Sequence, residues 1–166
     1  MVNGLGEHLR SAGAFEDSTE EQWEALYRVN LLHVFRVTKA FVPGMKERGW
    51  GRVVSFSSVE GIRSAPALAV YSAFKRAVDG FTKSLAVDLA RYGILVNAVA
   101  VDKTRSYQVG FYELPPDYER LIPTWVPAGR YADGDDVARA VLFLASDLNT
   151  WVVGQTLVTD LSLIHI

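Results

Sequence analysis

The stretch RVVSFS (residues 52–57) is rich in β-branched and apolar side chains and is bounded by glycine and polar residues. Two similar segments follow along the chain, ILVNAV (94–99) and QTLVT (155–159). Segments of this length and composition predict buried β-strands. Longer segments with apolar side chains at helical spacing separate them. Strands that alternate with helices in this way predict βαβ units and a parallel sheet.

Four helices are predicted around these strands. Ser18 followed by Glu21 is a capping-box pattern that opens the first helix, and the second runs from about residue 30 to 48. Pro43 lies inside the second helix and is expected to kink it or to mark its last turn. The fourth helix starts near Asp133. The third helix has one long apolar face, which consists of Val70, Phe74, Val78, Phe81, Leu85 and Leu89.

The composition excludes several classes of protein. Lys plus Arg is 17 and Asp plus Glu is 19, so the net charge of −2 leaves no electrostatic footprint for nucleic acid or an anionic membrane. No apolar run reaches the roughly 18 residues that span a bilayer. Cysteine is absent, so a thiolate metal site is excluded, no metal is expected, and a reducing cytoplasm is compatible with the chain. We therefore expect a cytoplasmic globular domain without nucleic-acid or membrane partners.

Tyr71 and Lys75 are the first candidates for chemistry. They are four residues apart in the third predicted helix, so their side chains share one face. A nearby ammonium lowers the pKa of a phenol and makes it a usable proton donor and acceptor. Ser58 follows the strand at 52–57, where ligands of parallel sheets bind, and its hydroxyl is a candidate to hold a substrate oxygen. The alternatives are a surface tyrosine beside a solvated lysine, and a serine that caps a loop.

Several motifs together resemble the short-chain dehydrogenase/reductase family. The motifs are residues 51–61, 71–75, 93–100, 141–147 and 154–157. The resemblance covers nearly all of residues 1–160. It implies an oxidoreductase that transfers a hydride between NAD or NADP and a carbonyl or secondary alcohol substrate. It also implies a homodimer or homotetramer for the full-length protein.

The resemblance assigns a role to each of four residues. Tyr71 would be the catalytic acid and base. Lys75 would lower the tyrosine pKa and hold the nicotinamide ribose, and Ser58 would orient the substrate oxygen. Asn30 would hold a water of the proton relay. The alternative for Asn30 is a helix-breaking residue that bonds its own backbone.

The loop that follows residues 94–99 departs from the family pattern. Val101 and Asp102 stand where the family usually has Pro-Gly. Val101, Thr104 and Ser106 are expected to contact the cofactor, with Ser106 in place of the family's threonine. The remainder of the segment 101–131 is rich in proline and aromatic residues. It is expected to form a lid over the site, and the alternative is a surface excursion held by its aromatic side chains.

The nucleotide-binding half of the family fold has no counterpart in this sequence. The family's Thr-Gly-x-x-x-Gly-x-Gly turn is absent, and Asn3 lies in Val-Asn-Gly-Leu-Gly, an altered form of the family's Asn-Asn-Ala-Gly stretch. Asn3 is nevertheless expected to bind the cofactor. We expect an incomplete Rossmann-like, doubly wound parallel sheet of the α/β class. It would correspond to family strands four to seven and lack the first βαβαβ half.

The limits of the domain follow from the same comparison. Residues 1–160 are expected to be the C-terminal portion of a single domain, inactive by itself. Residues 161–166 resemble a translated sequencing adapter, and the alternative is a genuine apolar tail. Two alternatives to a truncated enzyme are a naturally short chain that folds with a partner, and a non-catalytic scaffold that does not bind a dinucleotide.

Overall fold

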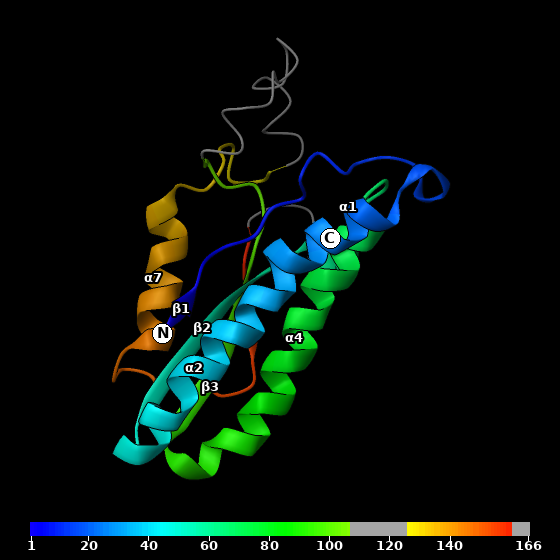
Figure 1. Cartoon of the computed structure of the whole chain (residues 1–166). Helices are drawn as coiled ribbons and strands as arrows, with labels where there is room; N and C mark the ends of the chain where they lie inside the picture. The colour runs from blue at the N-terminus through cyan, green and yellow to red at the C-terminus, as the bar shows by residue number, and fades with distance from the viewer. Residues whose placement is uncertain (107–125, 161–166) are drawn as a thin grey trace.

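The computed structural model describes residues 1–106 and 126–160 (Figure 1). The strands form one parallel sheet in the order β1-β2-β3-β4. Their bounds are β1 (Val2–Asn3), β2 (Gly51–Ser58), β3 (Ile94–Val101) and β4 (Thr156–Thr159). The prediction of a parallel α/β sheet is therefore confirmed.

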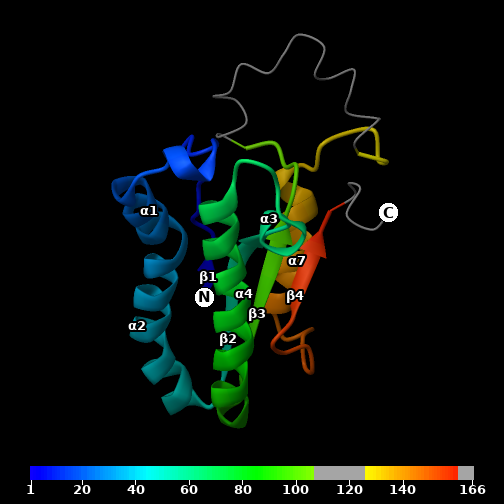
Figure 2. The same cartoon turned by 90° about the vertical axis from the view of Figure 1, so that its right-hand side faces the viewer.

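Helices cover both faces of this sheet (Figures 1 and 2). The helices are α1 (Glu20–Tyr27), α2 (His33–Arg48), α3 (Glu60–Arg63), α4 (Ala69–Leu89) and α7 (Gly134–Ala145). Shorter turns are the 3-10 segments η1 (Phe15–Asp17) and η3 (Ala90–Tyr92) and the π-helical segment η2 (Arg28–Leu32). Helices α2 and α4 lie on one face, and α7 lies on the other.

The start of the first helix differs by one residue from the predicted one. Thr19, not Ser18, is the N-cap, because its hydroxyl accepts from the backbone N–H of Gln22 while the Gln22 side chain accepts from the Thr19 N–H. Ser18 has other partners, since its hydroxyl accepts a hydrogen bond of 2.8 Å from the Trp23 indole. The sequence contains two overlapping capping-box patterns, Ser18 with Glu21 and Thr19 with Gln22. The contact of Ser18 with Trp23 leaves Thr19 as the N-cap.

The first two predicted helices are continuous in the structure, so Asn30 does not break the helix as its alternative reading expected. Helix α1 continues through η2 into α2, so the chain stays helical across Asn30. Helix α2 contains Pro43 in its interior and continues to Arg48, where Gly49 ends it in the left-handed conformation at φ 64°. A glycine at this position avoids the steric cost that a side chain would meet there.

The core is divided between the two faces of the sheet. The cluster under α2 and α4 consists of Met45, Val53, Ala86, Leu89, Ile94 and Val96. The cluster under α7 consists of Val54, Val99, Val137 and Leu144. Successive side chains of a strand point to opposite faces, so Val53 packs in the cluster under α2 and α4 and Val54 packs in the cluster under α7. Burial on both faces explains why β2 and β3 have continuous apolar sequences.

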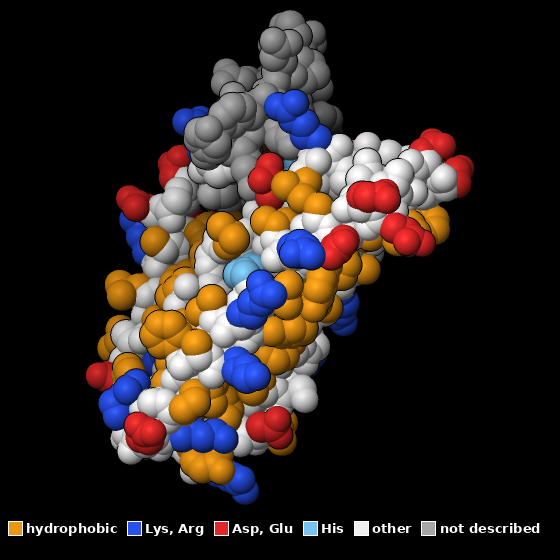
Figure 3. All heavy atoms as spheres, in the orientation of Figure 1, with side chains coloured by type: hydrophobic (Ala, Val, Ile, Leu, Met, Phe, Trp, Pro, Cys, Tyr) orange, Lys and Arg blue, Asp and Glu red, His pale blue; other side chains and the backbone are white. Residues whose placement is uncertain are grey.

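Apolar side chains also reach the surface beside β1. Val2 is 47% exposed and Leu142 of α7 is 66% exposed. In Figure 3, apolar side chains gather between α7 and α2, where Figure 1 places β1. Within the described residues, β1 pairs with β2 alone, so its other edge carries unpaired backbone groups. None of the helices described is both long and apolar enough to cross a membrane.

Candidate active site

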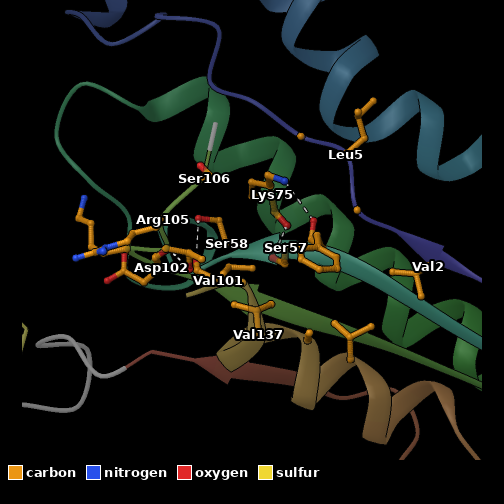
Figure 4. A pocket seen from close by; sticks show the side chains of 18 of the residues that line it. Val2, Leu5, Ser57, Ser58, Lys75, Val101, Asp102, Arg105, Ser106 and Val137 are labelled. Atoms are coloured by element: carbon orange, nitrogen blue, oxygen red, sulfur yellow. Dashed lines mark hydrogen bonds between the residues drawn. The ribbon is translucent and has the colours of Figure 1, made fainter. Parts of the chain in front are cut away.

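A cavity of about 1270 Å³ lies at the carboxyl ends of β2 and β3. Its walls come from the loop after β1, the ends of both strands, the start of α4 and the inner face of α7. Figure 4 shows Val137 of α7 on the side opposite Lys75. Ligands of open parallel sheets bind at this end of the strands. The predicted site residues that line the cavity are Ser58, Tyr71, Lys75, Val101, Thr104 and Ser106.

Lys75 is buried at the floor of this cavity. Its side chain is 3% exposed, and its Nζ donates a hydrogen bond of 3.2 Å to the Phe56 carbonyl (Figure 4). Burial lowers the pKa of Lys75 to about 8, although the charge of Asp79 opposes that change. A buried ammonium with a pKa near neutrality is typical of functional sites.

Tyr71 and Ser58 lie beside Lys75. Lys75 Nζ is 5.7 Å from the centre of the Tyr71 ring. Burial raises the pKa of Tyr71; a hydrogen bond with Ser58 opposes this change, and the charge of Glu60 adds to it. The expectation that Lys75 lowers the tyrosine pKa is therefore not met in this structure. The largest cause is the burial of the phenol, which disfavours its charged form.

The position of Ser58 depends on the end of β2. Ser58 pairs with Val101 across β2 and β3, and its hydroxyl donates to the Val101 carbonyl at 3.4 Å. The same hydroxyl accepts a hydrogen bond of 3.2 Å from the backbone N–H of Glu60. The hydroxyl of Ser57 points elsewhere and donates to the Lys75 carbonyl at 3.2 Å, which joins β2 to α4. These bonds hold Ser58 at the end of the strand beside α4.

Gly61 brings α3 against α4 at the level of Lys75. A Cβ at Gly61 would lie 2.9 Å from the Arg76 backbone nitrogen and 3.0 Å from the Lys75 carbonyl carbon. Both atoms belong to helix backbone, which cannot move aside like the end of a side chain. The close approach of α3 to α4 therefore requires glycine at this position.

Replacing Gly61 by alanine is expected to lower the free energy of unfolding by about 1–3 kcal/mol, because the new methyl group overpacks this contact. Gly80→Ala on α4 is the control, since a Cβ there meets nothing within 4 Å. We expect that control to be neutral or to stabilise by up to about 1 kcal/mol through helix propensity. Urea unfolding of both variants checks this, and equal stability of the two would contradict the proposed contact.

Asn30 is fully buried in η2 and holds the loop after β1. Its Oδ1 accepts from the Glu7 N–H at 3.1 Å, and its Nδ2 donates to the Glu7 and Leu26 carbonyls at 2.8 and 3.0 Å. Single π turns inside α-helices are frequent at functional sites. The bond to Leu26 matches the alternative of a residue that bonds its own helix. Its side-chain amide is thus occupied by backbone groups, and Asn30 does not line the cavity.

Gly6 lies between Asn30 and Lys75. A Cβ at Gly6 would lie 2.4 Å from Lys75 Nζ and 3.1 Å from Asn30 Oδ1. The φ of Gly6 is not in the left-handed region, so a side chain at this position is opposed by the nearby ammonium and not by the backbone conformation. The pair Asn30 and Gly6 therefore shapes the pocket that holds the lysine ammonium.

Asn3 does not reach the cavity. Its amide donates to the Thr38 hydroxyl at 3.4 Å and to the Ser55 hydroxyl at 3.3 Å, and the side chain is buried between β2 and α2. The expected cofactor contact is not supported by this placement. Its bonds instead join β1 to its neighbours.

The loop after β3 is tied to the segment that precedes α7. Thr104 forms a bridge with Ala132, the Arg105 N–H donates to the Ala132 carbonyl, and the Ala132 N–H donates to the Lys103 carbonyl. Val101, Thr104 and Ser106 are thereby held on the cavity wall. Most of the predicted lid, residues 107–125, and the predicted foreign tail, 161–166, lie outside the described residues.

Three residues of this site escaped the sequence analysis. Gly6 matters through a contact with Lys75 that is distant in sequence. His8 lines the cavity with its ring centre 6.2 Å from that of Tyr71, in an edge-on arrangement. Glu60 lines it too, two residues after Ser58. Only Glu60 had a signal in the sequence, since a charged residue two positions after the candidate serine lies close to the same site.

Known proteins share the sequence and the fold of this chain. A family model described as enoyl-(acyl carrier protein) reductase matches residues 1–161. Nodulation protein G of Azospirillum brasilense is 38% identical over 157 residues, which are 95% of this chain and 62% of that protein. The 3-oxoacyl-(acyl-carrier-protein) reductase FabG of Thermotoga maritima is 40% identical over 147 residues, which are 85% of this chain and 56% of that protein.

A solved structure shows the same arrangement of elements. Gluconate 5-dehydrogenase from Burkholderia cenocepacia, in complex with NADP and tartrate, superposes with a TM-score of 0.88 at 34% identity. The match covers 96% of this chain and 62% of that chain. The chain thus spans less than two thirds of the length of the relatives described here. The family match over residues 1–161 and the shared fold show that this chain belongs to the short-chain dehydrogenase/reductase family.

Proposed function

We propose that this chain carries the catalytic residues of an NAD(P)-dependent oxidoreductase acting on a carbonyl or secondary alcohol. The observation that carries the proposal is the buried ammonium of Lys75, which shares a cavity with Tyr71 and Ser58. Burying a charged lysine is costly, and a strongly perturbed ammonium in a cleft is a feature of functional sites. The family membership and the relatives, which include an acetoacetyl-CoA reductase of Shinella zoogloeoides, support a redox use.

Each residue then has a role at a stated atom. During reduction, the Tyr71 hydroxyl donates a proton to the carbonyl oxygen of the substrate. The Ser58 hydroxyl donates a hydrogen bond to the same oxygen, in place of its long bond of 3.4 Å to the Val101 carbonyl. Lys75 keeps a positive charge beside the phenol, which would offset part of the cost that burial imposes on the phenolate left after proton transfer. Asn30 would support the site by holding the loop after β1, since its side chain is bonded to the Glu7 and Leu26 backbone.

The residues present fit the nicotinamide end of NAD or NADP. An ammonium has three donors, and among the described residues Lys75 donates one hydrogen bond, to the Phe56 carbonyl, so further donors are available for ribose hydroxyls. Thr104 and Ser106 add hydroxyl groups on the same cavity wall. When bound, the cofactor supplies the hydride, and the protein supplies orientation and electrostatics.

The pyrophosphate end of the cofactor has no matching residues in this chain. The glycine-rich turn that approaches a pyrophosphate is absent from the sequence. We therefore propose that residues 1–160 act as the C-terminal portion of a longer polypeptide, whose other residues bind the phosphates and cover the exposed edge at β1. The same proposal includes a cytoplasmic homodimer or homotetramer without a nucleic-acid partner.

The proposal is tested with the intact protein that contains this chain. NADH and NADPH fluorescence titrations measure cofactor binding, and a panel of ketones and 3-oxoacyl thioesters measures reduction. We expect binding and turnover of at least one carbonyl substrate. If the folded protein changes the fluorescence of neither NADH nor NADPH, the proposal of an enzyme is rejected. The alternative of a scaffold that does not bind a dinucleotide is then favoured.

The pH dependence of carbonyl reduction gives a second test. Lys75 loses its charge as the pH rises through its pKa of about 8, so we expect kcat/KM for reduction to fall above that pH. Burial raises the pKa of Tyr71 above its ordinary 10.0, so the phenol does not cause this fall of kcat/KM, which forms the alkaline limb of the pH profile. In Lys75→Arg the charge persists, and the limb near pH 8 is expected to vanish from the remaining activity. An unchanged limb in that variant would contradict the assignment.

A further inference from the structure

Three charged side chains form a cluster beside the cavity, and two of them, Glu60 and Asp102, line it. Arg63 Nη2 lies 3.1 Å from Glu60 Oε1 and 3.3 Å from Asp102 Oδ1. The side chains are largely buried, with exposed fractions of 12% for Glu60, 6% for Asp102 and 31% for Arg63. Burial opposes the charge of Arg63, but its bond to Glu60 and the charges of Asp102, Glu60 and Asp160 raise its pKa overall. We call Glu60, Arg63 and Asp102 the Arg63 clamp.

The Arg63 clamp joins two loops that carry different parts of the site. Glu60 and Arg63 belong to α3, and the Glu60 N–H is bonded to the hydroxyl of Ser58. Asp102 begins the loop after β3, and its carbonyl accepts a hydrogen bond of 3.0 Å from the Thr104 hydroxyl. Figure 4 shows Asp102 beside Val101, close to Ser58. The clamp therefore connects the serine with the loop that holds Thr104 and Ser106.

The position of Asp102 explains why such a connection is useful. A proline fixes its own φ and reduces the conformational freedom of the loop that follows a strand. Val101 and Asp102 provide no such restriction where the family has Pro-Gly. A buried ion pair with a planar guanidinium restricts the same loop by a different means, through its fixed geometry.

We propose that the Arg63 clamp is a positioning device that holds the loop 101–106 at a fixed place relative to Ser58, in the role that Pro-Gly has elsewhere in the family. The inference rests on the proposed function, because the two loops would hold the cofactor and the substrate oxygen. Arg63 and Asp102 are thus positioning residues. They act through Ser58 on one side and through Thr104 and Ser106 on the other.

The test is a double-mutant cycle in the intact protein. Arg63→Met removes the charge and keeps most of the side-chain stem, and V101P/D102G restores the family residues in the loop. In the natural loop, we expect Arg63→Met to raise the KM for the cofactor about three- to tenfold, as the loss of a partly buried ion pair would. In the V101P/D102G background, the same change is expected to alter KM by less than about twofold, since Asp102 is no longer present.

Amide hydrogen exchange of the cofactor-free protein gives a readout that needs no catalysis. In the natural loop, Arg63→Met is expected to speed exchange at Arg105 and Ala132, whose N–H groups tie the loop to its neighbour. In the V101P/D102G background it should not. Arg63→Lys is expected to restore part of the protection. Arg28→Met, which breaks an exposed pair with Glu24, is the control and should change neither readout.

The outcomes distinguish failure of the proposed Arg63 clamp from failure of the proposed oxidoreductase function. Equal effects of Arg63→Met in both backgrounds, or no effect in either, would overturn the clamp. A protein that shows the exchange pattern but reduces no carbonyl would overturn the proposed function and leave the clamp standing. Thermal unfolding of every variant shows that a changed KM or exchange rate comes from a folded protein.

Discussion

Replacing Tyr71 by phenylalanine in the intact protein is expected to lower kcat by about 10²–10⁴-fold, the usual contribution of a positioned acid or base. The change removes one hydroxyl and keeps the ring, so the edge-on contact with the His8 ring can persist. Without that hydroxyl, the acid left beside Ser58 is the Lys75 ammonium, which points to the Phe56 carbonyl instead. Cofactor affinity should change little, because Lys75 is untouched.

Steady-state rates and a fluorescence titration with NADPH measure the two halves of this prediction. Tyr27→Phe is the matched control, because the Tyr27 ring packs against Phe74 with a centroid distance of 5.9 Å, away from the cavity residues. That variant should retain its turnover. A Tyr71→Phe protein with normal kcat would remove Tyr71 from the mechanism. Loss of cofactor binding in that variant would assign the hydroxyl to binding rather than proton transfer.

The parts of the fold that local sequence determines were predictable. The strands at residues 52–57 and 94–99 are buried on both faces, so their continuous apolar pattern identified them. The helix with Tyr71 and Lys75 has a long apolar face, and α4 spans Ala69–Leu89 as expected. The i,i+4 spacing then placed both side chains on one face, and the end of β2 placed Ser58 beside them.

The rest depended on contacts between distant residues. The π turn at Arg28–Leu32 brings Asn30 to the backbone of Glu7, a partner 23 positions away in sequence. The pKa of Tyr71 depends on how deeply α4 is buried and on Glu60, and neither can be deduced from spacing. A lysine four residues from a tyrosine indicates proximity. It does not indicate whether the ammonium points to the hydroxyl or, as here, to a carbonyl.

The second large effect is expected from Gly6→Ala. The new methyl group would lie 2.4 Å from Lys75 Nζ, so one of them must move. The ammonium is the end of a flexible side chain, whereas the loop at Gly6 is held by the Asn30 amide through Glu7. We therefore expect the ammonium to shift. A displacement of about 1 Å at a catalytic group can lower kcat up to about 10²-fold.

The same reasoning predicts a small effect on stability, since the end of a side chain can relax at a cost below about 1.5 kcal/mol. Gly13→Ala is the control, because a Cβ there meets nothing within 4 Å and should change neither kcat nor the unfolding midpoint. Measured together, kcat and urea unfolding distinguish a displaced ammonium from a damaged fold. Full activity in a folded Gly6→Ala protein would contradict the prediction, because it would show that catalysis does not require the present position of the Lys75 ammonium.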